Sequence, residues 1–413
     1  MPEAAPVTVY LDTQDYSRFG DVIRGQSSDE FERVFEQLKS LRDRGRARFV
    51  YSAAVVSELL QYDSEYEDTC IAKAKAIEQL CAGQVVLFPS RLVERQAADF
   101  AATQGILSIA PSWEWVRNGN EWFPRVSSEL ESFKDNLRQR MDDTIQQFGS
   151  LPRSVRRRLK GQGTDRVIIQ AARAAVPEIA SKYQLPEIAV ESSIILLLKG
   201  RISADEASLR LFGAIARPTA FVHVYFKTYE GDRTAIPLWL RAAGETLQAS
   251  FVQFRDQVRP LLTEEAHVKY LREVIAGDIS RLGLVLLRLI DTDEAENGVT
   301  SSVLEAISAH PNAATDIPCC NLMSVILLGY IEQTVAVLGQ GAKIERSFGG
   351  DLIHALYVDC VDIWRGDRRF SELLRQKLPS CRSKLQPSLL DLPDQIEKLW
   401  RERVAASLAM ASA

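Results

Sequence analysis

Short apolar runs alternate with amphipathic patterns at the beginning of the chain. Residues 7–12 (VTVYLD), 48–51 (RFVY) and 84–88 (QVVLF) have the β-branched and aromatic content that is typical of strands. Residues 27–44, 53–62 and 71–80 instead carry apolar positions at the spacing of helices that face a core. This alternation predicts parallel strands joined by right-handed helical crossovers.

The pattern changes between about residue 96 and about residue 341. Helical segments follow one another there, separated by turn signals such as Pro186 and Gly200, and only residues 220–226 (AFVHVYF) resemble a strand. The sequence has no fixed internal period, which argues against a solenoid. We therefore expect an all-helical block, in which residues 322–338 form a buried helix.

After Gly349 and Gly350 the alternation of helix and strand returns. It predicts a helix over residues 351–359, a strand over 360–364, a helix from near Phe370 and a final amphipathic helix. The expected fold class is α/β, with a central parallel sheet interrupted by a large all-helical insertion. Residues 1–95 and 342–413 would form the α/β domain, and residues 96–341 the insertion.

Composition limits the classes of protein that fit. The 413 residues are 46% hydrophobic and 25% charged, as in globular proteins, and the net charge of −5 excludes a protein that coats nucleic acid through bulk positive charge. Six cysteines without a C-x-x-C pair indicate free thiols rather than a structural zinc site. Because neither a signal peptide nor a sufficiently apolar membrane span is recognisable, we expect a cytoplasmic protein with no membrane partner.

Four acidic residues occupy positions at which a site can form. Asp12 closes the first strand and Asp367 follows the last, and the carboxyl ends of parallel strands meet at one edge of a sheet. Glu58 lies in an apolar helix, and Asp351 opens a helix after two glycines. Each also has a simpler role: a turn residue for Asp12 and Asp367, an exposed helix position for Glu58, and an N-cap for Asp351.

Taken together, the four acids favour a metal centre. Crowded carboxylates repel one another unless cations lie between them, and Mg²⁺ or Mn²⁺ prefers oxygen ligands. The four histidines are far apart in the sequence, which does not favour a histidine-rich site. Carboxylates are therefore the expected ligands.

Three stretches, VYLDTQDYSRF, SAAVVSELL and DLIHALYVDCVDIWRGDRRF, resemble the motifs of PIN-domain nucleases in order and context. The matching positions are Asp12 with Thr13, Glu58 with Leu59, Asp351 with Ala355, and Asp367 with Phe370. The resemblance covers roughly residues 7–95 and 345–378. It implies a PIN-like three-layer fold and a metal-dependent endoribonuclease that hydrolyses phosphodiester bonds.

The resemblance also implies roles for these residues. Asp12, Glu58 and Asp351 would hold Mg²⁺ or Mn²⁺, and Asp367 would complete the site. The cations would lower the pKa of the attacking water and stabilise the charge that develops on the phosphate. RNA is the expected partner, and an inhibitory or regulatory protein is a further candidate.

Two positions depart from the family pattern. Gln14 stands where asparagine is common, and Arg365 stands where a threonine or serine usually supports the last acid. Because a long cation replaces that hydroxyl, the role of Asp367 is open and Asp362 is an alternative ligand. Arg365 also favours a second hypothesis, a catalytically inactive scaffold of this fold that binds RNA or a protein through the insertion. A third hypothesis is a phosphatase-like or DNA-directed hydrolase.

Two sets of residues are candidates for substrate contacts. The basic run in the insertion contains Arg156, Arg157, Arg158 and Lys160, which suit phosphate binding. The simpler role of such a run is a solvated helix end. His354, one helical turn after Asp351, is the second candidate, with a structural role as its alternative.

Overall fold

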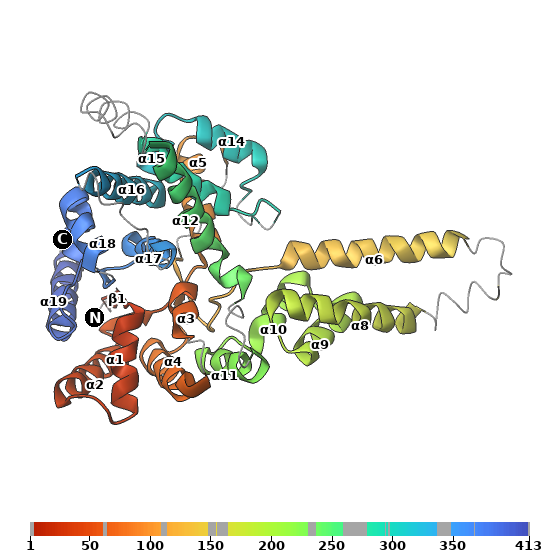
Figure 1. The fold of residues 1–413 in the computed structure, drawn as a ribbon, viewed down its shortest axis with the longest axis horizontal. Helices are drawn as coiled ribbons and strands as arrows, with labels where there is room; N and C mark the ends of the chain where they lie inside the picture. Colours follow the sequence, from red (N-terminus) through yellow and green to blue (C-terminus); the bar gives the residue numbers. More distant parts are fainter. Residues whose placement is uncertain are drawn as a thin grey trace.

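The computed structural model describes residues 4–60, 64–108, 114–147, 154, 164–229, 237–258, 279–293, 295, 298–336, 348–366 and 368–411. This part of the chain is mostly helical and contains a small sheet (Figure 1). Its three parallel strands have the order β2-β1-β5, where β1 is Val7–Tyr10, β2 is Ala47–Val50 and β5 is Ile363–Trp364. Strands from both ends of the chain therefore meet in one parallel sheet, as the sequence predicts.

The register of the sheet aligns the ends of its strands. Tyr10 is opposite Val50 of β2 and Trp364 of β5, so all three strands end at the same edge. A parallel bridge from Tyr51 leads to β3 (Val85–Val86), which pairs on its other side with the antiparallel β4 (Val116–Arg117). The sequence predicts an all-helical block from about residue 96, and β4 lies inside that block. The prediction is wrong at this point, because a strand of two residues leaves no periodic signal.

The first 103 residues contain the helices that follow β1, β2 and β3 in the chain. They are α1 (Thr13–Ile23), α2 (Asp29–Asp43), α3 (Ala53–Leu59), α4 (Glu67–Cys81) and α5 (Pro89–Thr103), with the short η1 (Ser64–Tyr66) before α4. The sequence does not predict α1, because its buried face mixes Tyr16 and Phe19 with Thr13, Asp15 and Gly20. This mixture weakens the apolar period that would reveal a helix.

Most of the described residues between α5 and α17 form further helices, two of which extend away from the rest of the described chain (Figure 1). These two are α6 (Ser127–Gln147) and α8 (Thr164–Tyr183). The others are α9 (Glu187–Leu198), α10 (Ala204–Gly213), α11 (Pro218–Tyr229), α12 (Leu238–Val258), η4 (Ile279–Leu289), α14 (Ser301–Ala309), α15 (Ala313–Asp316) and α16 (Pro318–Ala336). Among the described residues, no helix is both long and apolar enough to cross a bilayer.

The predicted strand over residues 220–226 is wrong, because these residues belong to α11. Their side chains at Phe221, Val222, Tyr225 and Phe226 are buried, which is the spacing of a helix face. β-Branched and aromatic residues favour strands locally, but packing against the core decides the conformation here. The predicted buried helix is present as α16, in which Leu322, Met323 and Ile326 are buried.

The C-terminal part returns to the sheet through α17 (Phe348–Ala355), η5 (Val358–Cys360) and β5, and then forms α18 (Arg368–Lys377), η6 (Pro379–Lys384) and α19 (Leu392–Ala411). The helix predicted over residues 351–359 thus begins three positions earlier, at Phe348. The strand predicted over residues 360–364 is shorter and consists of Ile363–Trp364. The final amphipathic helix is confirmed.

Aromatic packing fixes the start of α12. The Trp239 ring lies 5.8 Å from that of Trp122 and 5.6 Å from that of Phe212, measured between centroids. Its Nε1 donates a hydrogen bond to the Tyr183 carbonyl at 3.1 Å. Such buried aromatic clusters hold a helix in one orientation. As a result, the residues that follow Trp239 are placed close to the carboxyl edge of the sheet.

Two glycines allow α12 to pack closely on α17. A Cβ at Gly349 would lie 2.3 Å from the Gly244 carbonyl oxygen. We expect Gly349→Ala to destabilise the protein by about 1–3 kcal/mol, because the helices must separate. Gly213→Ala is the matched control, since a Cβ there meets nothing within 4 Å. It should be neutral or slightly stabilising in urea unfolding, and equal effects of both changes would contradict this packing.

Asp99 on α5 should make stability depend on pH. Its two carboxylate oxygens are buried and have no hydrogen-bond partner in the described part of the chain. Burial raises the pKa of Asp99 from 3.8 to about 6, against the attraction of Arg95. Because the folded state then binds the proton more tightly, this contribution to stability is complete below pH 3.8 and is lost as the pH rises through about 6.

The difference in unfolding free energy between wild type and Asp99→Asn, measured from pH 4 to pH 7, isolates this contribution. We expect the variant to gain stability relative to wild type as the pH rises. Asp29→Asn, at an exposed acid of α2, should leave the wild-type profile unchanged. A difference that is constant with pH would refute the raised pKa.

Candidate metal centre

Three side chains from distant parts of the sequence meet at the carboxyl edge of the sheet. Asp12 follows β1, Glu58 lies on α3 and His354 lies on α17. One carboxylate oxygen of each acid and one ring nitrogen of His354 all lie within 4.8 Å of one another. This is the kind of spacing from which a single cation can be held.

Asp12 has both a capping role and a place in this group. It is the N-cap of α1, and its Oδ1 accepts a hydrogen bond from the Thr13 backbone N–H at 2.7 Å. The simpler role that the sequence suggests for Asp12 is therefore real. The cap also fixes the orientation of the carboxylate, which leaves Oδ2 for another partner.

Glu58 is held by its neighbours rather than free on the helix surface. The Thr13 hydroxyl donates to Glu58 Oε2 at 2.6 Å, and the side chain is 34% exposed. A Cβ at Gly350 would lie 3.0 Å from Glu58 Oε1, so only glycine leaves this oxygen uncrowded. The alternative of a plain exposed helix glutamate does not agree with these contacts.

His354 is buried behind the two acids. Its Nδ1 lies 2.6 Å from the Tyr10 hydroxyl, which in turn lies 2.8 Å from Ser52 Oγ. Its Nε2 lies 3.1 Å from Glu58 Oε1, with which a protonated His354 forms an ion pair. In the described part of the chain, Nε2 is thus a buried nitrogen with only an ion-pair neighbour.

The pKa values of the three groups reflect their mutual contacts. Burial raises the pKa of Asp12, and repulsion from Glu58 adds to this, while His354 opposes it. Burial would also raise the pKa of Glu58, but the attraction of His354 and the Thr13 hydrogen bond lower it overall. For His354, burial lowers the pKa, yet the nearby acids raise it to about 9. Without a metal, His354 is the cation that compensates the carboxylates.

The other predicted ligands have different outcomes. Asp351 lines the same cavity as Asp12 and Glu58 but does not belong to the group of three. Its prediction as an N-cap is wrong, because α17 begins at Phe348 and Asp351 lies inside it. Asp367 lies outside the described residues.

The candidate substrate residues of the basic run also lie outside the described residues. They are Arg156, Arg157, Arg158 and Lys160. Of the neighbouring cations, Arg166 is described and is exposed on α8. Their proposed contact with phosphate stays a prediction.

Asp362 is not an alternative ligand. Its Oδ2 accepts a hydrogen bond from the Thr8 backbone N–H at 2.7 Å, and its Oδ1 is paired with Arg403 of α19. Because Thr8 lies near the start of β1, these contacts place Asp362 away from the carboxyl edge where Asp12 lies. It links the sheet to α19.

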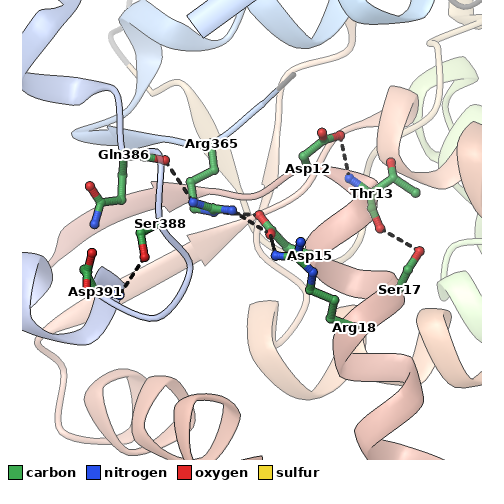
Figure 2. A network of polar contacts seen from close by, with 9 residues as sticks. All are labelled: Asp12, Thr13, Asp15, Ser17, Arg18, Arg365, Gln386, Ser388 and Asp391. Atoms are coloured by element: carbon green, nitrogen blue, oxygen red, sulfur yellow. Dashed lines mark hydrogen bonds and ion pairs between the residues drawn. The ribbon is translucent and has the colours of Figure 1, made fainter. Parts of the chain in front are cut away.

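Arg365 binds a different aspartate from the one that the sequence suggests. Figure 2 shows its guanidinium between the Gln386 carbonyl and Asp15, with Asp12 and Thr13 farther from it, at the start of α1. Its Nε and Nη2 donate to the two oxygens of Asp15 at 2.8 and 2.9 Å, and Nη1 donates to Gln386 at 2.9 Å. This cation therefore compensates buried Asp15 and is not directed at Asp12.

A cavity of about 850 Å³ opens in front of the acids. Its lining includes Asp12, Glu58 and Asp351, together with Arg241 and Gln248 of α12. The insertion thus contributes to the walls of the site. Sequence reasoning places the insertion's substrate contacts in the basic run and does not identify these α12 residues.

Sequence reasoning also misses Tyr10 and Ser52. Tyr10 ends β1 and resembles any apolar strand residue, and Ser52 resembles a helix cap, which it is. The one signal in the local sequence was the serine directly before α3, which is a residue type that favours the N-cap position. Tyr10 contacts His354 directly and Ser52 contacts the Tyr10 hydroxyl. The Tyr10–His354 contact depends on the meeting of β1 and α17, which are more than 330 positions apart.

Comparison with known proteins gives no relative, since neither a family model nor a curated protein nor a solved structure matches this chain. A function must therefore be inferred from the chemistry of the Asp12, Glu58 and His354 group. Two carboxylates and one imidazole nitrogen form a donor set that fits a divalent cation. The buried Nε2 without a hydrogen bond and the space left by Gly350 agree with that fit.

Proposed function

We propose that this protein is a metal-dependent endoribonuclease with a PIN-like site, which hydrolyses phosphodiester bonds. The observation that carries the proposal is the convergence of the Asp12, Glu58 and His354 ligand atoms within 4.8 Å at the carboxyl edge of a parallel sheet. Ligands of α/β proteins bind at this edge. Mg²⁺ or Mn²⁺ is the proposed cofactor.

In the proposed reaction, a water oxygen bonds to phosphorus and one bridging P–O bond breaks. One product end then carries the phosphate and the other a hydroxyl group. A bound cation would supply activation of that water and compensation of the phosphate charge. Asp12 and Glu58 would hold the cation, and the Thr13 hydroxyl would keep Glu58 in a fixed orientation. Asp351 lines the same cavity and would help to orient the bound substrate.

Arg241 of α12 is the proposed contact for a substrate phosphate. It lines the same cavity as the acids, and its Nη1 lies 3.0 Å from Glu245 Oε1 in a half-exposed ion pair. Such exposed pairs are weak, so a phosphate can replace the carboxylate partner. The cavity between α3, α12 and α17 has room for a nucleotide unit of an extended strand.

Cleavage of labelled substrates by the full chain tests this function. Single-stranded RNA, single-stranded DNA and a phosphomonoester should be incubated separately with Mg²⁺, with Mn²⁺ and with a chelator. We expect RNA cleavage at internal positions that requires the cation and stops with the chelator. Cleavage of DNA or of the monoester alone would instead support the hydrolase alternatives.

A catalytically inactive scaffold is the second candidate. The ion pair between His354 and Glu58 favours it, because an internal cation already compensates the acids and no metal is then required. The extended pair α6 and α8 would offer a surface for RNA or for a protein partner (Figure 1). Calorimetry that detects no binding of Mg²⁺ or Mn²⁺ would favour the scaffold over the nuclease.

A further inference from the structure

We propose that His354 is a metal ligand through Nε2, and that the centre consequently prefers a first-row transition ion such as Mn²⁺ to Mg²⁺. The inference rests on the metal centre of the proposed function and specifies its chemistry. Nε2 is 3.1 Å from Glu58 Oε1 and belongs to the group whose ligand atoms lie within 4.8 Å. The His354 side chain is only 4% exposed, so this nitrogen is aimed into the site and not toward bulk water.

The contacts on the other ring nitrogen support this assignment. If Nδ1 carries the proton, it donates to the Tyr10 hydroxyl at 2.6 Å, and Tyr10 can donate to Ser52 Oγ at 2.8 Å. Nε2 then presents its lone pair to the two carboxylates. In the metal-free protein a proton on Nε2 faces Glu58 Oε1 at 3.1 Å, and a bound cation would take the place of that proton. Histidines that bind metals are commonly held in this way by a partner on the second nitrogen.

The surroundings keep the ring in place. Tyr357 stacks on Tyr10 with 5.4 Å between ring centroids, and its hydroxyl donates to the Leu87 carbonyl at 3.1 Å. Trp364 Nε1 donates to the His354 carbonyl at 3.0 Å. All of these side chains are buried. A ligand that is fixed before the cation arrives loses little conformational entropy on binding.

The donor set decides which cations are favoured. Mg²⁺ is a hard ion that takes oxygen ligands and keeps several waters, whereas imidazole suits first-row transition ions. An all-carboxylate centre discriminates weakly between Mg²⁺ and Mn²⁺. Replacement of one carboxylate by an imidazole shifts the preference toward Mn²⁺ and the later ions of that row. His354 would therefore set the metal selectivity of this centre.

The metal alone serves as the probe, with the full chain prepared free of metal. Binding of Mn²⁺ is followed by loss of the free-ion electron paramagnetic resonance signal, and Mg²⁺ is added as a competitor. Electron spin-echo modulation of bound Mn²⁺ reports directly on a coordinated ¹⁴N nucleus. We expect ¹⁴N modulation in the wild type, and Mn²⁺ binding at least about tenfold tighter than that of Mg²⁺.

Variants separate ligation from a structural role. His354→Gln should lose the ¹⁴N modulation and bind Mn²⁺ about 10–100-fold more weakly, with a smaller change for Mg²⁺. Tyr10→Phe should keep the modulation but weaken Mn²⁺ binding. His223→Gln is the matched control, since His223 is 60% exposed on α11, and it should behave as the wild type. Circular dichroism checks that each variant is folded.

The outcomes distinguish the two levels of the proposal. If wild-type protein binds Mn²⁺ with dependence on Asp12 but shows no ¹⁴N modulation, His354 is not a ligand and the carboxylate centre still stands. If the wild type binds neither Mn²⁺ nor Mg²⁺, both the inference and the metal-dependent function are refuted. The spectroscopic result on the wild type does not depend on the folding of any variant.

Discussion

Asp12→Asn is expected to abolish cleavage of RNA while the protein stays folded. Asp12 is one of the three proposed ligands, and a metal centre contributes several kcal/mol of transition-state stabilisation. Loss of about 4 kcal/mol corresponds to a rate lower by about a thousandfold. Initial rates at saturating Mg²⁺ or Mn²⁺, together with calorimetric titration of the cation, measure the effect.

The fold should tolerate this change for two reasons. Asparagine caps a helix about as well as aspartate, so the hydrogen bond from Thr13 to the N-cap can be retained. The pKa of Asp12 is raised by burial and by Glu58, so its charge does not stabilise the metal-free protein. The variant should therefore unfold at or slightly above the wild-type denaturant concentration.

Two companion variants make the result specific. Asp351→Asn should also lower the cleavage rate, because Asp351 lines the same cavity, whereas the exposed Asp29→Asn should leave it unchanged. Full activity in both Asp12→Asn and Asp351→Asn would refute the nuclease proposal.

Removal of one partner of the Asp15–Arg365 pair is expected to cost about 3–5 kcal/mol of unfolding free energy. The pair is bidentate, with contacts of 2.8 and 2.9 Å, and the side chains are 2% and 11% exposed. Arg365→Ala would leave the buried Asp15 carboxylate with only Arg18 as a cationic neighbour, whose Nη1 is 3.9 Å from Oδ1. Arg365→Lys should also destabilise the protein, because an ammonium group cannot reproduce the two parallel hydrogen bonds.

A surface pair of similar length provides the control. Arg173 and Glu191 also approach to 2.8 Å, but their side chains are 69% and 35% exposed. Arg173→Ala should change stability by less than about 1 kcal/mol. Urea unfolding of both alanine variants measures the difference. An Arg365→Ala protein as stable as Arg173→Ala would show that burial does not make this pair important.

This pair also bears on the chemistry of the site. Asp15 is one turn after Asp12 on α1, and its charge contributes to the raised pKa of Asp12. Arg365 compensates the negative charge of Asp15. This weakens the repulsion between Asp15 and the proposed metal ligand Asp12. The residue that departs from the PIN pattern is thus a structural cation of α1 and β5, and its presence does not by itself argue for an inactive site.

The sequence alone determined the parallel strands and most of the helices around them. Apolar runs at 7–12 and 48–51 became β1 and β2 because each is short, β-branched and flanked by amphipathic helices. Asp12 and Glu58 were identifiable because the end of a first strand and an apolar helix are visible in local sequence. The rule that parallel strands end at one edge placed Asp12 there, whereas the resemblance to PIN motifs implied the place of Glu58 beside it.

Only the tertiary structure decided the third member of the group. His354 lies on the same helix as Asp351, and no local pattern shows which of the two faces the acids. The answer depends on the packing of α17 against α12, where Gly349 meets Gly244, and on the hydrogen bond between His354 Nδ1 and the Tyr10 hydroxyl. Likewise, the partner of Arg365 depends on how α1 lies against β5. Contacts between residues about 340 positions apart are set by packing of the whole chain, and local periodicity carries no record of them.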